Sequence, residues 1–260
     1  MQIETAFSDV SLPTREIKPR SKGLTMMIDW GLPLGHQKDI LEASGYYVDM
    51  AKIAGTIPGL LPKDILQKKL ATYAAFDVST SQGGLFTEHA YIQGKLPQFF
   101  EEIAKLGFSA VEVSDNLLNW SLKEKRQTIL MAIEDYGLKV LGEVGRKDRV
   151  MTDEEIIADL EVCMVSGVSA VFIEAYELFS GEKIREDLIK KIFDRFPPEK
   201  IIYELPVVVL PGINREFKHK VASWMVAEFG EDVNLANVEW DEVLFTEMVR
   251  RKIGDNLEIG

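Results

Sequence analysis

Four glutamates recur at nearly equal intervals in similar apolar surroundings, and carboxylates in such a pattern could bind a divalent cation together. They are Glu112 in AVEVS, Glu143 in VLGEVG, Glu174 in VFIEA and Glu204 in IIYELP. Buried carboxylates that meet raise one another's pKa unless a metal ion, a basic side chain or protonation compensates their charge. Mg²⁺ suits an oxygen-rich site that must also hold an anionic substrate. The alternative is that some of these glutamates point outward and pair with basic residues of helices.

Three basic residues lie at or just beyond the ends of predicted strands, where they could meet the glutamates. They are Lys52, Arg146 and Lys147. Each could compensate part of the negative charge of the carboxylates. Lys52 could alternatively form a Schiff base with a carbonyl substrate, as a desolvated lysine amine can.

Other polar residues at strand ends or helix starts extend the candidate site. Gln82-Gly83-Gly84 could present backbone N–H groups to an anion, or could form only a turn. His89, which follows Glu88 at a helix start, could act as an acid or a base. The first and third predicted strands contribute acids and the last contributes amides, namely Asp29, Asp77, Asn234 and Asn237.

Composition and motifs exclude several functions. The chain has 30 Lys and Arg against 42 Asp and Glu, a net charge of -12, which argues against nucleic acid as the main partner. No histidine pair has the spacing of a zinc site, and neither a Walker loop nor a GxGxxG follows a strand. The single cysteine, Cys163, fits a reducing compartment.

These features predict a cytoplasmic protein that acts on a small anionic molecule. The chain has no apolar run long enough for a membrane span, and its first residues do not have the pattern of a signal peptide. We therefore expect no membrane and no nucleic-acid partner. The sequence leaves the subunit number open, so a homo-oligomer stays an alternative.

The elements that must position these residues alternate along the chain from Gly23 onward. Short apolar runs end in polar clusters, and amphipathic stretches of helical length follow. Ser121 with Glu124, and Thr152 with Glu155, have the spacing of capping boxes and predict helices over 122–136 and 153–165. Glu88–Leu106 is a helical stretch that Gly94 and Pro97 could divide in two. The predicted strands are Leu24–Trp30, Tyr46–Ile53, Ala71–Ser79, Ala110–Asn116, Lys139–Gly145, Ala170–Tyr176, Ile201–Pro206 and Val233–Val238.

Eight strand–helix units in about 240 residues predict an α/β protein with a single-domain (β/α)₈ TIM barrel. We place the barrel at residues 23–260, after an N-terminal arm of residues 1–22 that contains Pro13 and Pro19. A doubly wound open sheet also alternates strands and helices and is the main alternative. In a barrel, inward-facing glutamates near the carboxyl ends of strands would meet at the mouth, where these folds carry their chemistry.

Several of these strand-end segments together resemble the phosphosulfolactate synthase family of TIM-barrel proteins. The resemblance runs from about Gly23 to Asn256, and the chain also resembles the plant heat-stress-associated branch of this family. The matching segments are GLTMMID at Gly23–Asp29, GLP at Gly31–Pro33, VDMAK at Val48–Lys52, GLFTE at Gly84–Glu88, LGFSAVEVSD at Leu106–Asp115, EVGRK at Glu143–Lys147, VNLAN at Val233–Asn237 and DEV at Asp241–Val243.

The resemblance implies a Mg²⁺-dependent addition of sulfite to phosphoenolpyruvate, a step towards coenzyme M. It implies that Lys147, or Arg146 in its place, protonates the developing carbanion, with Lys52 nearby. The implied metal ligands are the strand-end acids Asp29, Glu112, Glu143, Glu174 and Glu204. The implied substrate contacts are Gly84, Glu88, Ser114, Asn234 and Asn237.

The chain departs from this family where basic residues of the pattern are replaced by Trp30, Tyr176 and the apolar segment Val207–Leu210. Two alternatives to the synthase reaction therefore stay open. The same site could act on a less anionic or bulkier substrate. The barrel could also serve as a non-catalytic binding or stress-protection protein.

Overall fold

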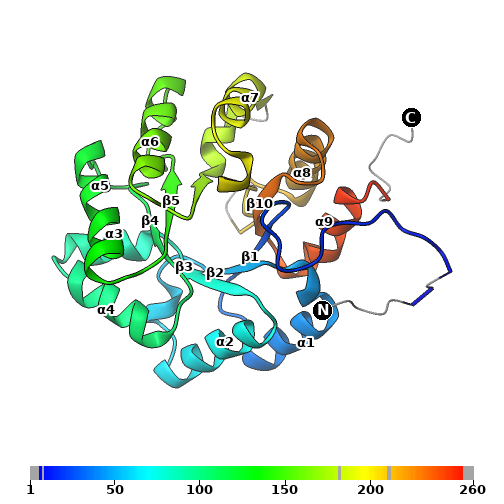
Figure 1. The fold of residues 1–260 in the computed structure, drawn as a ribbon, viewed down its shortest axis with the longest axis horizontal. Helices are drawn as coiled ribbons and strands as arrows, with labels where there is room; N and C mark the ends of the chain where they lie inside the picture. The colour runs from blue at the N-terminus through cyan, green and yellow to red at the C-terminus, as the bar shows by residue number, and fades with distance from the viewer. Residues whose placement is uncertain (1–5, 8, 181–182, 210–211, 254–260) are drawn as a thin grey trace.

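Eight parallel strands form a nearly closed barrel that a ring of helices surrounds (Figure 1). The computed structural model describes residues 6–7, 9–180, 183–209 and 212–253. The barrel strands are β1 Thr25–Asp29, β2 Met50–Ile53, β3 Ser79–Gln82, β4 Val111–Val113, β5 Val140–Val144, β6 Ala170–Ile173, β9 Ile201–Glu204 and β10 Asn234–Val238. The helices are α1 Leu34–Ser44, α2 Lys63–Ala75, α3 Leu85–Ile92, α4 Leu96–Leu106, α5 Leu122–Leu130, α6 Asp153–Val165, α7 Glu186–Arg195, α8 Arg215–Phe229 and α9 Val243–Arg250.

The strand order confirms the predicted (β/α)₈ barrel and excludes the doubly wound sheet. Around the barrel the order is β3-β2-β1-β10-β9-β6-β5-β4, so the last strand pairs with the first. A small antiparallel hairpin, β7 Phe179–Ser180 with β8 Lys183–Ile184, is inserted between β6 and β9. No helix among the described residues is long and apolar enough to cross a membrane.

Two apolar layers fill the protein. The larger layer lies between the strands and the surrounding helices, and the smaller one fills the barrel interior. Side chains alternate between these layers along each strand, because successive strand residues point to opposite faces. The interior residues are Met26, Ala110, Leu141, Ala170, Phe172, Ile202 and Ala236.

This alternation decides where the four glutamates point. Each of them stands two residues after a member of the interior layer: Ala110, Leu141, Phe172 and Ile202 precede Glu112, Glu143, Glu174 and Glu204. The glutamates therefore face into the barrel, close to the carboxyl ends of their strands. The alternative in which some of them pair with the outer helices is wrong.

The third strand lies later in the chain than the sequence predicts. The sequence predicts a strand at Ala71–Ser79, but α2 continues to Ala75 and the strand itself is Ser79–Gln82. Within that run, Tyr73 lies on the buried side of α2, together with Leu66 and Leu70 from earlier in the helix. The real strand reads STSQ and carries almost no apolar signal. Asp77 consequently lies in the turn before β3, with a φ of 53°, and is not a mouth residue.

Several local predictions are confirmed. Both capping boxes are formed, since Ser121 and Thr152 each accept a hydrogen bond from the backbone of the residue three positions on. The stretch Glu88–Leu106 contains the end of α3 and all of α4, with Gly94 at a left-handed φ of 64° between them. The long fifth helix is α5 followed by one π-helical turn, Met131–Asp135.

The arm packs against the amino-terminal end of the barrel and against α9, where it is dark blue in Figure 1. The Arg15 guanidinium binds the carboxylate of Glu247 on α9 and donates to the carbonyl oxygen of Gly23. Arg20 forms a buried ion pair with Asp49 at 3.0 Å, just before β2. Ion pairs between the arm and the barrel therefore hold the described part of the arm from Arg15 onward.

A side chain joins β3 to β4, the two strands at the ends of the sheet order. The Gln82 amide group donates to the carbonyl oxygen of Glu112 at 3.0 Å and accepts from its N–H at 3.3 Å. The Thr87 hydroxyl donates to the same carbonyl oxygen at 2.5 Å. The Gln82 amide thus takes the place of a peptide group in the ladder, and it holds the backbone of Glu112.

We expect Gln82→Leu to destabilise the protein by about 1–3 kcal/mol, because it leaves the buried N–H of Glu112 without its partner and removes one of the two donors to its carbonyl oxygen. The measurement is the free energy of unfolding in urea. Gln93→Leu is the matched control, since Gln93 is exposed after α3 and should change stability very little. Equal stability of the two variants would show that the Gln82 amide does not hold β3 and β4 together.

Candidate active site

A pocket of about 380 Å³ opens at the carboxyl ends of the barrel strands and contains most of the predicted site residues. The four glutamates, Lys52 and Lys147 form its charged side. The other described residues that line it are Ile28, Trp30, Ala54, Gly55, Gly83, Gly84, Leu85, Asn116, Tyr176, Val207, Val209 and Asn237. This is the end of a (β/α)₈ barrel at which catalytic groups are found.

Three of the glutamates converge closely enough to share one cation. One carboxylate oxygen from each of Glu143, Glu174 and Glu204 lies within 4.8 Å of the other two, and all three residues are buried. Apart from an ion pair with Lys147, the buried Oε2 of Glu174 has no partner among the described residues. Oxygen donors that are buried and short of partners fit a hard cation such as Mg²⁺.

Lys52 compensates the charge at the inner end of the pocket. Its ammonium group lies 2.9 Å from Oε2 of Glu112 and 2.5 Å from Oε1 of Glu204. It also lies 4.2 Å from the centre of the Phe172 ring, in the interior layer. Burial alone would lower the pKa of Lys52, but the carboxylates of Glu112 and Glu204 outweigh burial and raise it well above its usual value. Lys52 is therefore a charged ammonium group, which opposes its use as a Schiff-base amine.

Lys147 stands at the open side of the cluster. Its ammonium group lies 2.9 Å from Oε2 of Glu174 and 3.9 Å from Oε1 of Glu143, and it donates to Oδ1 of Asn116 at 3.0 Å. Its side chain is 30% exposed, unlike that of Lys52, so a bound molecule could reach it. Burial lowers its pKa, but Glu143 and Glu174 raise the pKa more strongly, so it carries a proton at neutral pH.

The cluster divides its charge unequally among the carboxyl groups. Burial raises the pKa of Glu112 well above its usual value, and it raises that of Glu174 to about 8, with the charges of Glu204 and Glu143 adding to the effect. For Glu143, burial acts in the same direction, but Lys147 and Lys52 outweigh it and lower the pKa. Groups with such divergent pKa values in one cleft are typical of functional sites.

Two glycines allow the backbone to approach the cluster. The N–H of Gly84 donates to Oε1 of Glu112 at 2.6 Å. A Cβ atom at Gly84 would lie only 2.4 Å from Oγ of Ser114, and one at Gly83 would lie 2.5 Å from the backbone nitrogen of Gly55. The loops after β2, β3 and β4 therefore pack so closely that only glycine fits at these two positions. Gly84 lines the pocket as expected, although its N–H group serves Glu112.

Asp29 does not join the cluster, contrary to expectation. Asp29 is one of the β1 residues that point outward, towards the helices. Its carboxylate therefore binds Lys69 of α2 at 2.8 Å and accepts a hydrogen bond from the Tyr73 hydroxyl at 2.7 Å. Its other oxygen accepts from the N–H groups of Gly31 and Leu32. The alternation along β1 explains the error, because Ile28 is the residue that lines the pocket.

Glu88 and Ser114 bind each other beneath the pocket wall and do not line it. The Ser114 hydroxyl donates to Glu88 at 2.5 Å, and the N–H groups of Asn116 and Leu117 donate to the same carboxylate. Burial raises the pKa of Glu88. These contacts give Glu88 the role of holding the loop after β4.

Arg146 and Asn234 also lie outside the pocket. The Arg146 guanidinium binds Asp148 and the carbonyl oxygen of Leu118, so it points away from Glu143, three residues earlier in the chain. Asn234 begins β10 and therefore lies at the opposite end of the barrel, where it accepts from the N–H of Leu24 at 2.8 Å and donates to the carbonyl oxygen of Ile201 at 2.9 Å.

Asn237 reaches the pocket by way of an irregularity in β10. The register with β1 shifts between Thr25, which pairs with Leu235, and Met27, which pairs with Val238. Asn237 adopts a φ of 58° at this shift, which turns its side chain to the mouth. Strict alternation from the sequence could not predict this.

Asn116 is a pocket residue that was not predicted as part of the site. Its side chain donates to the carbonyl oxygen of Gly145 at 2.9 Å and accepts from Lys147 at 3.0 Å. The N–H of Lys147 donates to the carbonyl oxygen of Asn116 at 3.0 Å. Its only sequence signal was its place at the end of a predicted strand.

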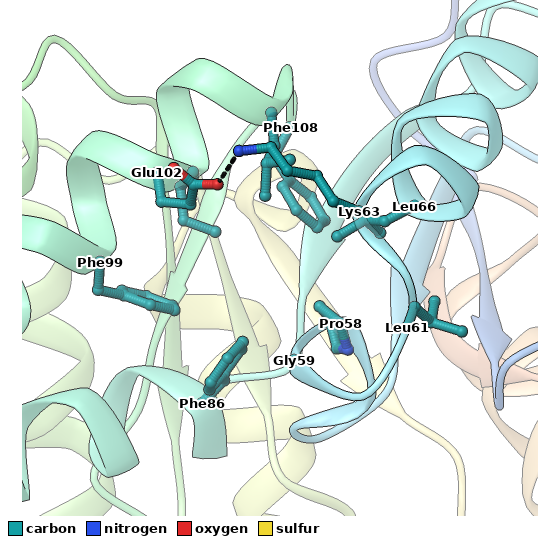
Figure 2. Close-up of a pocket in the computed structure, with 11 residues that line it drawn as sticks. Pro58, Gly59, Leu61, Lys63, Leu66, Phe86, Phe99, Glu102 and Phe108 are labelled. Atoms are coloured by element: carbon teal, nitrogen blue, oxygen red, sulfur yellow. Dashed lines mark hydrogen bonds and ion pairs between the residues drawn. The ribbon is translucent and has the colours of Figure 1, made fainter.

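A second, smaller pocket of about 210 Å³ lies away from these groups, between α2 and α4 (Figure 2). Its lining is mostly apolar and includes Phe86, Phe99 and Phe108. The exposed ion pair of 2.7 Å between Lys63 and Glu102, which the dashed line in Figure 2 marks, is also part of the lining. It contains none of the predicted site residues.

Comparison with known proteins gives concordant results. The pattern of the (2R)-phospho-3-sulfolactate synthase (ComA) family matches residues 13–255. The phosphosulfolactate synthase of Methanothermobacter thermautotrophicus is 33% identical over 264 residues, which cover 96% of both chains. The protein Heat-stress-associated 32 of Arabidopsis thaliana is 23% identical over 265 residues, covering 91% of this chain and 88% of the plant protein.

Among solved structures, 3-hexulose-6-phosphate synthase from Salmonella typhimurium has a similar fold. Its TM-score is 0.56 at 12% sequence identity, and the match covers 89% of this chain and all of that one. A likeness at this level of identity supports the barrel architecture and carries no information about the reaction.

Proposed function

Because this chain belongs to the (2R)-phospho-3-sulfolactate synthase family, we propose that it is a Mg²⁺-dependent lyase-type enzyme that adds sulfite, or a related nucleophile, to phosphoenolpyruvate or a similar unsaturated acid. The observation that carries this proposal is the convergence of Glu143, Glu174 and Glu204 beside the ammonium group of Lys147. Such an addition requires two things: carboxylates that can bind a hard cation, and a proton donor.

Glu143, Glu174 and Glu204 would hold the Mg²⁺ ion. When bound, the ion supplies positive charge that stabilises the enolate-like charge on a substrate carboxylate. Glu112 would remain paired with Lys52, which is in turn paired with Glu204. The charge of Lys52 keeps this inner group of carboxylates together.

In the proposed reaction, the sulfur lone pair of sulfite forms a carbon–sulfur bond at the methylene carbon of the enol. The electron pair of the carbon–carbon double bond moves to the neighbouring carbon and its carboxylate. The Lys147 ammonium then transfers a proton to that carbon, and the neutral amine recovers a proton from water. Lys147 suits this role better than Arg146, whose guanidinium binds Asp148 outside the pocket.

The proposal is tested by incubating the purified protein with phosphoenolpyruvate, sulfite and Mg²⁺ and following the product by ³¹P NMR and mass spectrometry. We expect product only with Mg²⁺, with loss on chelation and recovery when Mg²⁺ is restored. Glu143→Gln should lower kcat/KM by at least about a hundredfold, since even partners of metal ligands cost 10–100-fold when removed.

Glu102→Gln is the control for that variant, because Glu102 is a partly exposed residue of α4 that is not among the described residues lining the active-site pocket. It should leave turnover unchanged. Absence of product, together with equal Mg²⁺ binding by the wild type and Glu143→Gln in calorimetry, would reject the proposal and favour a non-catalytic barrel.

A further inference from the structure

The mouth of the active-site pocket has a charged side and an apolar side. The apolar side, here named the rim, consists of Trp30, Tyr176, Val207 and Val209. Trp30 follows β1, Tyr176 follows β6, and the two valines follow β9, so three separate loops bring these side chains to one opening. Ile28 and Leu85 extend the apolar surface into the pocket.

The rim is exposed although it is apolar. Trp30 is 39% exposed, Tyr176 is 47% exposed and Val209 is 57% exposed. Apolar side chains that gather at the opening of a pocket, rather than being scattered over the surface, mark a surface that contacts a ligand. Ligand pockets commonly combine such a lining with a few polar groups that fix orientation.

The cations on the charged side of the pocket already contact carboxylates of the protein. These two cations, Lys52 and Lys147, are each within 2.9 Å of a carboxylate oxygen. None of the described lining residues is an arginine. A substrate could therefore place one anionic end near Lys147, while the part that faces the rim meets hydrocarbon and aromatic rings.

We propose that the preferred substrate of this site is not phosphoenolpyruvate itself but a similar unsaturated acid that carries an apolar substituent, and that the rim binds the substituent. The inference rests on the proposed function for the position of the acid end, which lies among the glutamates and Lys147. The substituent extends from there towards Trp30 and Tyr176. Burial of this substituent against the rim then makes the substituted acid bind more tightly than a small polar acid.

The test compares two probes that share an acid end and differ by one aromatic ring: pyruvate and phenylpyruvate. Their dissociation constants are measured by titration calorimetry at saturating Mg²⁺. We expect phenylpyruvate to bind at least about tenfold more tightly than pyruvate, because its aromatic ring buries much apolar surface against the rim. In Trp30→Ala and in Tyr176→Ser, the ratio of the pyruvate to the phenylpyruvate dissociation constant should fall below about threefold, with pyruvate binding unchanged.

Val165→Ala serves as the matched control, since Val165 is 73% exposed at the end of α6 and is not part of the pocket. It should keep the wild-type ratio. Equal binding of the two probes by the wild type, no binding of phenylpyruvate, or a ratio that persists in both rim variants would overturn the inference. These measurements need no turnover, so a failed sulfite addition with an intact binding ratio would reject the proposed reaction alone.

Discussion

Lys147→Met is expected to slow turnover by about 10²–10⁴-fold, the usual contribution of a positioned acid–base group. The variant removes the one ammonium group among the described pocket residues that is both beside the glutamates and partly exposed. Steady-state kinetics of sulfite addition give the effect, and single-turnover measurements separate the proton transfer from substrate binding. Lys147→Arg keeps the positive charge, but a guanidinium is a far weaker acid than an ammonium group. Turnover by this variant should therefore stay slow while its Mg²⁺ binding persists.

The matched control is Lys95→Met, which removes an exposed lysine before α4. It should leave turnover within about twofold of the wild type. A Lys147→Met enzyme that keeps more than a tenth of the wild-type rate would remove Lys147 from the reaction. Thermal unfolding of each variant distinguishes loss of chemistry from loss of fold.

Lys125→Met is expected to destabilise the protein by about 3–5 kcal/mol, the usual effect of removing one partner from a buried ion pair. Lys125 is fully buried, and its ammonium group lies 2.9 Å from Asp115 and 2.7 Å from Asp159. It also donates to the carbonyl oxygen of Glu143 at 2.7 Å. The variant would leave two carboxylates without their counter-charge and would free the end of β5 that carries a proposed metal ligand.

Urea unfolding measures this effect, and two comparisons isolate its cause. Lys125→Met combined with Asp159→Asn should recover part of the loss, because an amide leaves no unpaired buried charge at that position. Lys68→Met breaks an exposed pair with Asp64 on α2 and should cost at most about 0.5 kcal/mol. Similar effects of the two lysine variants would contradict the role of burial.

The barrel was predictable because its signals are local and repeated. Apolar runs and capping boxes specify strand–helix units without reference to the rest of the chain. The exception, β3, shows the limit. Its STSQ sequence lacks an apolar pattern, and the side chains of Ser79, Thr80 and Gln82 form hydrogen bonds to neighbouring segments instead. The end of α2 carries the stronger apolar signal.

The glutamate cluster was predictable for a related reason. Equal spacing in a repeated fold places Glu112, Glu143, Glu174 and Glu204 at similar heights, and the interior residues two positions earlier set their direction. Asp29 follows the same strand-end pattern but falls on the other parity, and therefore faces Lys69. Which alternate residues of a strand face the barrel interior depends on the neighbours that bury each face. The sequence of a single short strand gives little information about those neighbours.

The sequence by itself determined the (β/α)₈ repeat, the inward glutamates and the presence of lysines at two strand ends. Only the tertiary structure decided which basic side chain pairs with which acid. Lys52 and Lys147 reach the glutamate cluster, whereas Arg146 binds Asp148. Glu88 binds the loop after β4 and does not reach the cluster. The physical reason is that a strand's periodicity fixes the direction of its own side chains. The partners of long charged side chains come from loops and helices distant in sequence, and burial and hydrogen-bond geometry select among them.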